Sequence, residues 1–176
     1  MRVFRGFQRT VCSCELCVIN CRFIPGYLLP EDLDKIASFH GAKFNPFLDW
    51  HHQAASFRQF ILTNLLASPG ALVMKDGRVF RIRTLVPARH DKGWCKFFDG
   101  TLCTIHAVSP FGCAFFDSHQ GQSQSNAISA MGLQIIAGLW EDQPRSLYCQ
   151  VWKELYGKGM RAPAPEECRE RMRNHK

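Results

Sequence analysis

Seven of the chain's nine cysteines lie in two short groups. The first reads C-S-C-E-L-C-V-I-N-C, and the second reads C-K-F-F-D-G-T-L-C-T-I-H-A-V-S-P-F-G-C. Neighbouring thiols crowded this closely cannot all reach good disulfide geometry with separate partners, whereas one metal centre needs several sulfurs within a few ångströms. The pattern therefore predicts a metal–thiolate protein. The candidate ligands are Cys12, Cys14, Cys17, Cys21, Cys95, Cys103 and Cys113.

The length and composition predict one folded domain with its own hydrophobic core. The chain has 176 residues, of which 46% are hydrophobic, so a metal is not needed as its only source of folding energy. Residues 1–157 are expected to form this domain, and residues 158–176 a basic, partly ordered tail. No apolar run approaches the roughly 20 residues that span a bilayer, and the Arg-containing amino terminus lacks a signal-peptide core. We therefore expect a cytoplasmic protein with reduced thiols and no membrane contact.

The net charge of +7 raises the alternative of a zinc-dependent nucleic-acid binder. Much of this charge lies near the two ends, where glutamates are mixed among the carboxyl-terminal basic residues. The arginines are not interleaved with clustered aromatic residues that could stack on bases. The sequence thus disfavours nucleic acid as a partner and leaves a redox or protein partner open.

Local signals predict an α+β fold, mostly helical, with a short β-hairpin and cysteine-rich metal-binding loops. A helix is expected to start in L-P-E-D-L, residues 29–33, and to stop at Gly41. A second, longer helix is expected to start at Asn45 and to end at S-P-G, residues 68–70. Asp76-Gly77 lies between two β-prone runs, residues 71–75 and 78–85, and predicts a hairpin whose second strand is irregular.

The carboxyl-terminal third is expected to be helical. After a polar loop over residues 118–125, apolar spacing predicts a helix over 126–139 and another over 146–156 that ends at Gly157. The latter has a wide apolar face, which buries Cys149. Cys168 lies among charged residues and is expected to be an exposed thiol.

The spacing of the first group, C-x2-C-x3-C from Cys14 to Cys21, suits a short loop folded around one site, and Cys12 adds a fourth thiol. Four thiolates satisfy a tetrahedral zinc ion or an iron–sulfur cluster, and the spacing does not separate the two. The second group, C-x7-C-x9-C, is looser. Because seven thiolates exceed the needs of one zinc, we expect an iron–sulfur cluster, of the 4Fe–4S type, and keep zinc in a structural or interaction module as the alternative.

The order of these cysteines resembles the YkgJ-type cysteine-cluster family, described as a zinc- or iron-chelating domain. In that family an amino-terminal cysteine cluster precedes a stretch similar to C-K-F-F…C-T-I-H-A-V-S-P-F-G-C, with a Pro-Glu-Glu-like helix start between them, here Pro30-Glu31-Asp32. The resemblance covers most of residues 12–117 and implies a metal site. The chain departs from the pattern at Arg22, Ser109 and Ala114, where the family has a second cysteine and two basic residues. The resemblance implies redox chemistry less firmly, and whether the protein is an enzyme stays open.

Two histidines are secondary candidates for the metal site. His106 follows Cys103 by three residues, and the resemblance implies a packing or supporting role for it. His119 follows Cys113 by six residues and could enter the metal shell. His51 and His52 are adjacent, which is not the spacing of a metal pair on a helix, and we expect His51 at the edge of an apolar face and His52 at the surface.

Overall fold

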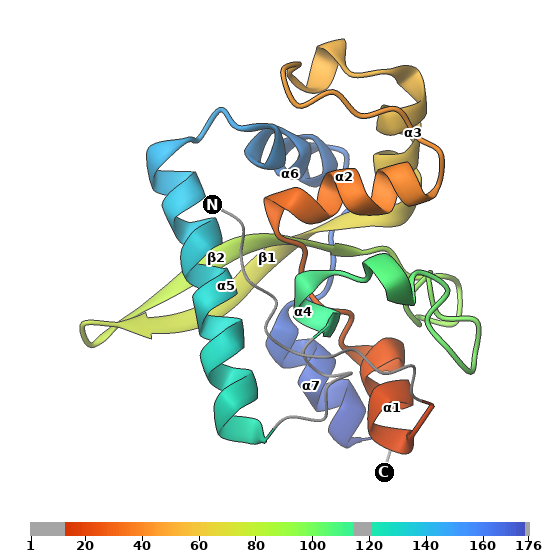
Figure 1. Ribbon diagram of the computed structural model, residues 1–176. Helices are drawn as coiled ribbons and strands as arrows, with labels where there is room; N and C mark the ends of the chain where they lie inside the picture. The colour runs from red at the N-terminus through yellow and green to blue at the C-terminus, as the bar shows by residue number, and fades with distance from the viewer. Residues whose placement is uncertain (1–12, 115–120, 175–176) are drawn as a thin grey trace.

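The computed structural model describes residues 13–114 and 121–174 of the chain (Figure 1). Within them it contains seven α-helices, two 3-10 turns and a two-stranded antiparallel sheet, which confirms the predicted α+β class. The helices are α1 Glu15–Phe23, α2 Pro30–Phe39, α3 Ala55–Asn64, α4 Phe111–Ala114, α5 Gln122–Asp142, α6 Leu147–Gly157 and α7 Pro165–Arg173. The 3-10 turns are η1 Trp50–His52 and η2 His106–Val108, and the strands are β1 Leu65–Lys75 and β2 Arg78–Pro87. No helix in these residues is both long and apolar enough to cross a membrane.

The hairpin turns at Asp76-Gly77, as predicted. Both residues have positive φ angles, 51° and 71°, which suit a two-residue turn between twisted strands. The strands pair from Lys75 with Arg78 down to Leu65 with Pro87. The expected irregularity lies in β1 rather than in the second strand, because the register shifts between Ser68 and Ala71. The S-P-G segment is therefore not a helix end, and that prediction is wrong.

The helix predicted from Asn45 begins ten residues later than expected, at Ala55. A buried glutamine, Gln53, instead holds the preceding segment as a loop. Its Nε2 donates to the carbonyls of Asn45 and Leu48, and its Oε1 accepts from the Asn45 N–H at 3.1 Å. These bonds satisfy backbone groups that a helix would otherwise pair.

The other helix predictions hold more closely. Helix α2 stops before Gly41, which has a φ of 72°, and α6 ends at Gly157. Helix α5 starts earlier than predicted, at Gln122, where the side chain of Gln122 bonds that of Asn126 one turn later. Cys149 on α6 is fully buried, as expected.

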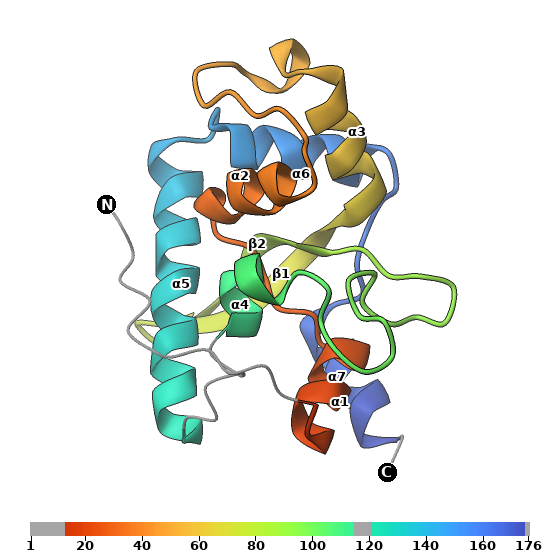
Figure 2. The same cartoon turned by 45° about the vertical axis from the view of Figure 1, so that its right-hand side comes forward.

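Five of the helices lie at two ends of the molecule, and the long helix α5 runs past β2 between these ends (Figures 1 and 2). Helices α2, α3 and α6 form one end, and α1 packs against α7 at the other. The core between them contains fully buried Ile36, Phe57, Leu85 and Leu155. Figure 2 shows the long segment between β2 and α4 beside α1, which brings the two cysteine groups to the same end of the molecule.

Helix α7 lies in the segment expected to be a partly ordered tail. It contacts α1 and β1, and only 6% of Cys168 is exposed. The expectation of an exposed Cys168 is therefore wrong. Its sulfur accepts a hydrogen bond from Nη2 of Arg89 at 3.2 Å.

Candidate metal centre

The first cysteine group is carried by helix α1 rather than by the expected loop. Cys14 is the residue that precedes the helix, and its carbonyl accepts the first helical hydrogen bond, from Val18 N–H. Cys17 and Cys21 are four residues apart and so lie on the same face of the helix. Cys12 lies outside the described residues.

The segment that holds Cys95 and Cys103 folds back on itself. The backbone forms isolated bridges between Arg89 and Cys95 and between Phe98 and Cys103. At its tip, Oδ1 of Asp99 accepts from the N–H groups of Thr101 and Leu102, both at 2.8 Å. These two bonds hold the pKa of Asp99 below its ordinary value. The turn at Asp99 thus folds the segment between Cys95 and Cys103 back on itself.

A backbone hydrogen bond ties this segment directly to α1. The N–H of Cys95 donates to the carbonyl of Cys21 at 3.1 Å. The two cysteine groups therefore meet through their own backbones, and the positions of these two side chains are set relative to one another.

Cys113 lies near Cys21 and Cys95 because residues 112–113 approach residues 26–27 very closely. The N–H of Gly112 donates to the carbonyl of Tyr27 at 2.9 Å, and the N–H of Gly26 donates to Sγ of Cys113 at 3.1 Å. A β-carbon on Gly26 would overlap the backbone of Gly112 and Cys113. Glycine is needed at this crossing because any side chain would push Cys113 away from α1.

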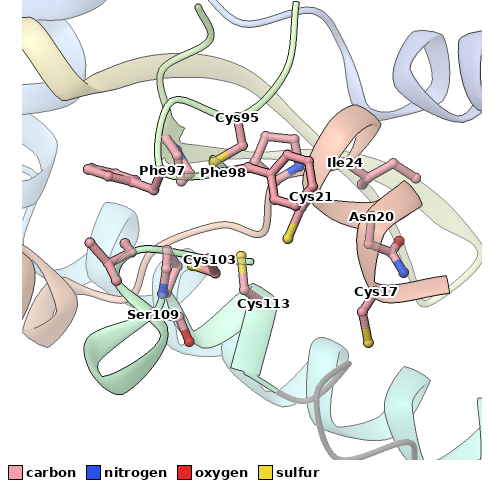
Figure 3. Close-up of a pocket in the computed structure, with 14 residues that line it drawn as sticks. Cys17, Asn20, Cys21, Ile24, Cys95, Phe97, Phe98, Cys103, Ser109 and Cys113 are labelled. Carbon is pink, nitrogen blue, oxygen red and sulfur yellow. The ribbon is translucent and has the colours of Figure 1, made fainter. Parts of the chain in front are cut away.

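One cavity collects the side chains of Cys17, Cys21, Cys95, Cys103 and Cys113. Figure 3 shows the sulfurs of Cys21, Cys103 and Cys113 turned toward a shared space below Cys95, while the sulfur of Cys17 lies apart from them. The remaining wall is largely apolar. It includes Ile24, Pro25, Pro87, Phe97, Phe98, Ile105 and Pro110.

The electrostatics identify the same four thiols. Burial, with smaller contributions from the neighbouring Cys103 and Cys21, raises the pKa of Cys95 to about 12, whereas Arg89 opposes the shift. Burial also raises the pKa of Cys113, with added repulsion from Cys95, Cys103 and Cys21. Four sulfurs that repel each other as anions in an apolar enclosure need a compensating cation to become thiolates together.

The donor set fits a soft metal centre. All five potential donors on the cavity wall that can be deprotonated are cysteines, and no histidine or carboxylate is among the described residues that line it. Sulfur-only sites hold zinc or iron–sulfur clusters. In residues 13–114 and 121–174, no three His, Cys, Asp or Glu side chains are grouped tightly enough to hold a single metal ion as they stand.

Two charged residues that position the site were not singled out as site residues from the sequence. Oδ2 of buried Asp32 accepts from the N–H of Leu29 at 2.9 Å and from that of Phe111 at 2.8 Å, so it fixes the start of α4 before Cys113. Arg89 donates to the carbonyls of Phe23 and Gly93 and to Cys168. Asp32 had a sequence signal, the P-E-D helix start. Arg89 had none, because two of its partners, Phe23 and Cys168, lie in segments far from it in the sequence.

None of the described histidines lines the cavity that the cysteines share. His106 begins η2 beside the cavity but is not part of its wall, and His119 lies outside the described residues. His52 is exposed, as expected, and its ring bonds Asp49 at 2.8 Å. His51 is exposed as well, and not at the edge of an apolar face as expected.

Comparison with family models, curated proteins and solved structures gave no match to this chain. The resemblance to the YkgJ-type family therefore stays a prediction that rests on the order and spacing of the cysteines.

Proposed function

We propose that this protein binds one iron–sulfur cluster through Cys21, Cys95, Cys103 and Cys113 and uses it in electron transfer or redox chemistry. The observation that carries the proposal is the convergence of these four thiols, from α1, the folded-back segment and α4, on one largely apolar cavity. Four cysteines are the usual ligand set of such clusters. The proposal narrows the seven candidate ligands to four.

One feature favours a cluster over a single zinc ion. The Gly26 N–H that bonds the sulfur of Cys113 is the kind of contact that tunes the potential of a cluster. When bound, the cluster would supply a one-electron carrier.

The surroundings suit electron exchange with a partner in a reducing compartment. Cys21 and Cys103 are partly exposed, so the centre lies close to the surface. None of the eight described cysteines forms a disulfide, and we therefore place the protein in the cytoplasm. The partner is proposed to be a redox protein, and no residue of the described chain assigns a substrate.

The test is anaerobic purification followed by absorption spectroscopy and assays of iron, acid-labile sulfide and zinc. We expect a brown protein with visible absorption that bleaches on reduction by dithionite. Serine variants of Cys21, Cys95, Cys103 and Cys113 should each lose most of the iron, because one missing thiolate leaves the centre under-coordinated. Cys149→Ser, a fully buried cysteine on α6, is the matched control and should keep it.

A colourless protein with one zinc and no iron after anaerobic preparation would refute the cluster and support the alternative of a structural zinc module. Full iron content in the Cys95→Ser, Cys113→Ser double variant would refute the site itself.

A further inference from the structure

Cys14 and Cys17 are not among the four proposed metal ligands, although Cys17 also lines the cavity. Cys14 precedes α1 and is exposed, and Cys17 lies in its first turn and is only 6% exposed. Neither residue is among the charges that raise the pKa of Cys95 or Cys113. Figure 3 shows the sulfur of Cys17 away from those of Cys21, Cys103 and Cys113. These two thiols of one short motif therefore lie outside the proposed set of four ligands.

The spacing of this pair is that of a dithiol that can close into a disulfide. C-x-x-C places its two cysteines one helical turn apart, and the motif is typical of thiol–disulfide exchange. Cys14 has an extended backbone, with φ −62° and ψ 158°, and therefore stands outside the helix that holds Cys17. This freedom at the helix entry lets the first sulfur move toward the second without breaking a helical turn.

The two cysteines also differ in the way that such a reaction requires. Exposed Cys14 is accessible to a sulfur of a partner molecule, whereas Cys17 is buried and lies one helical turn further along the chain. Leu16, between them, has 59% of its surface exposed and gives a partner an apolar contact beside the thiol. We infer that Cys14 and Cys17 form a redox-active dithiol that reduces a disulfide of a partner molecule, with Cys14 as the attacking and Cys17 as the resolving cysteine.

The reaction balances without any further reagent. The Cys14 thiolate attacks one sulfur of the partner disulfide, the partner's S–S bond breaks, and its first sulfur leaves as a thiol after taking a proton. The Cys17 thiolate then attacks the Cys14 sulfur, and the partner's second sulfur leaves as a thiol. The partner disulfide gains two electrons and two protons, and the Cys14–Cys17 pair loses them as it becomes a disulfide.

The inference rests on the proposed function only in assigning the other four cysteines to the metal. Its test uses the anaerobically purified holoprotein, with glutathione disulfide as the probe. Samples are equilibrated with mixtures of reduced and oxidised glutathione, blocked with N-ethylmaleimide and analysed by peptide mass spectrometry. Metal content is measured on the same samples. We expect a loss of two hydrogens, mapped to Cys14 and Cys17, with metal content unchanged.

Variants separate the two roles. Cys17→Ser should trap a glutathione mixed disulfide on Cys14 that lasts at least about tenfold longer than in the natural protein, because the resolving thiol is gone. Cys14→Ser should form no such adduct on Cys17. Cys12→Ser is the matched control for the neighbouring cysteine and should still form the Cys14–Cys17 disulfide.

Three results would overturn the inference. One is a loss of metal in Cys14→Ser or Cys17→Ser as large as that in Cys21→Ser, which would make these residues ligands. Another is a disulfide that joins Cys12 to either of them in place of the pair. The third is an unreacted pair when most of the glutathione is oxidised. A protein without metal would refute the proposed function, while the mass spectra would still decide the dithiol.

Discussion

Gly112 lies very close to the loop before α2, next to Cys113. We therefore expect Gly112→Ala, which adds one methyl group there, to destabilise the protein. The new β-carbon would overlap the backbone nitrogen of Tyr27 and lie 2.9 Å from the carbonyl carbon of Gly26. Carbon atoms normally stay about 3.5–4.0 Å apart. Both neighbours are backbone atoms, so neither can turn aside as a side chain would, and the two segments must separate.

The loss in free energy of unfolding has two sources, the steric overlap and the weakening of two hydrogen bonds. Overpacking of a rigid site costs about 1–3 kcal/mol. The Gly112 N–H bond to Tyr27 and the Gly26 N–H bond to Cys113 are weakened, at about 0.5–1.5 kcal/mol each. We expect Gly112→Ala to lower the free energy of unfolding of the metal-free protein by about 2–6 kcal/mol and to lower metal content, since Cys113 moves with α4.

The assay is urea unfolding of the metal-free protein, together with metal analysis after reconstitution. Gly138→Ala is the matched control, because a β-carbon there meets no atom within 4 Å and lies inside helix α5. Its free energy of unfolding should stay the same or rise by up to about 1 kcal/mol. If Gly112→Ala unfolds within about 0.5 kcal/mol of the natural protein and binds metal fully, the proposed tightness of this crossing is wrong.

Three further predictions concern the groups around the centre. Asp32→Asn should lower the free energy of unfolding by about 1–3 kcal/mol in urea melts, because two backbone N–H groups lose a charged acceptor; Asp34→Asn, on the exposed side of α2, should change it by less than about 0.5 kcal/mol. Cys168→Ser should leave metal content unchanged but cost about 1–2 kcal/mol of stability in the same assay, because the sulfur is buried and bonded to Arg89; an unchanged urea midpoint would contradict this. Burial raises the pKa of Cys95 from 9.0 to about 12, so the folded metal-free protein holds this proton more tightly than the unfolded chain. The resulting stability is complete below about pH 9 and is lost as the pH rises toward about 12, by up to about 4 kcal/mol, and urea melts of Cys95→Ala should show a smaller alkaline loss.

The local elements that were predicted correctly depend on neighbouring residues. Asp76-Gly77 makes the hairpin because both residues accept a positive φ, and Gly41 stops α2 for the same reason. Such signals lie within a few positions of the structure that they determine, so the sequence displays them directly.

The errors arise where distant or side-chain hydrogen bonds override a local pattern. Asn45 is a good helix cap, but the amide of Gln53 bonds the carbonyls of Asn45 and Leu48 and keeps the chain in a loop. Cys168 lies in a charged stretch, yet the packing of α7 on α1 buries it beside Arg89. Neither partner could be identified from the spacing of the residues in the chain.

The candidate site, too, was only partly predictable from the sequence. The grouping of the cysteines indicated a metal centre, but the choice among the seven depends on tertiary contacts. Cys21 meets Cys95 through a backbone hydrogen bond, and Cys113 meets them through the glycine crossing at Gly26. Had α1 been predicted as a helix, the four-residue spacing of Cys17 and Cys21 would have placed both on one face, without showing that their sulfurs diverge.

The contacts that bring the four thiols together are independent of any metal. Asp32 fixes the start of α4, the Asp99 turn shapes the folded-back segment, and Arg89 joins that segment to the end of α1. Cys95 is itself part of the hydrophobic core that also holds Ile36. A site supported in this way differs from a zinc finger, in which the metal provides the folding energy. The scaffold therefore brings the four thiols to one cavity without help from a metal, and under the proposed function a bound cation would relieve the mutual repulsion of their thiolate forms rather than organise the fold.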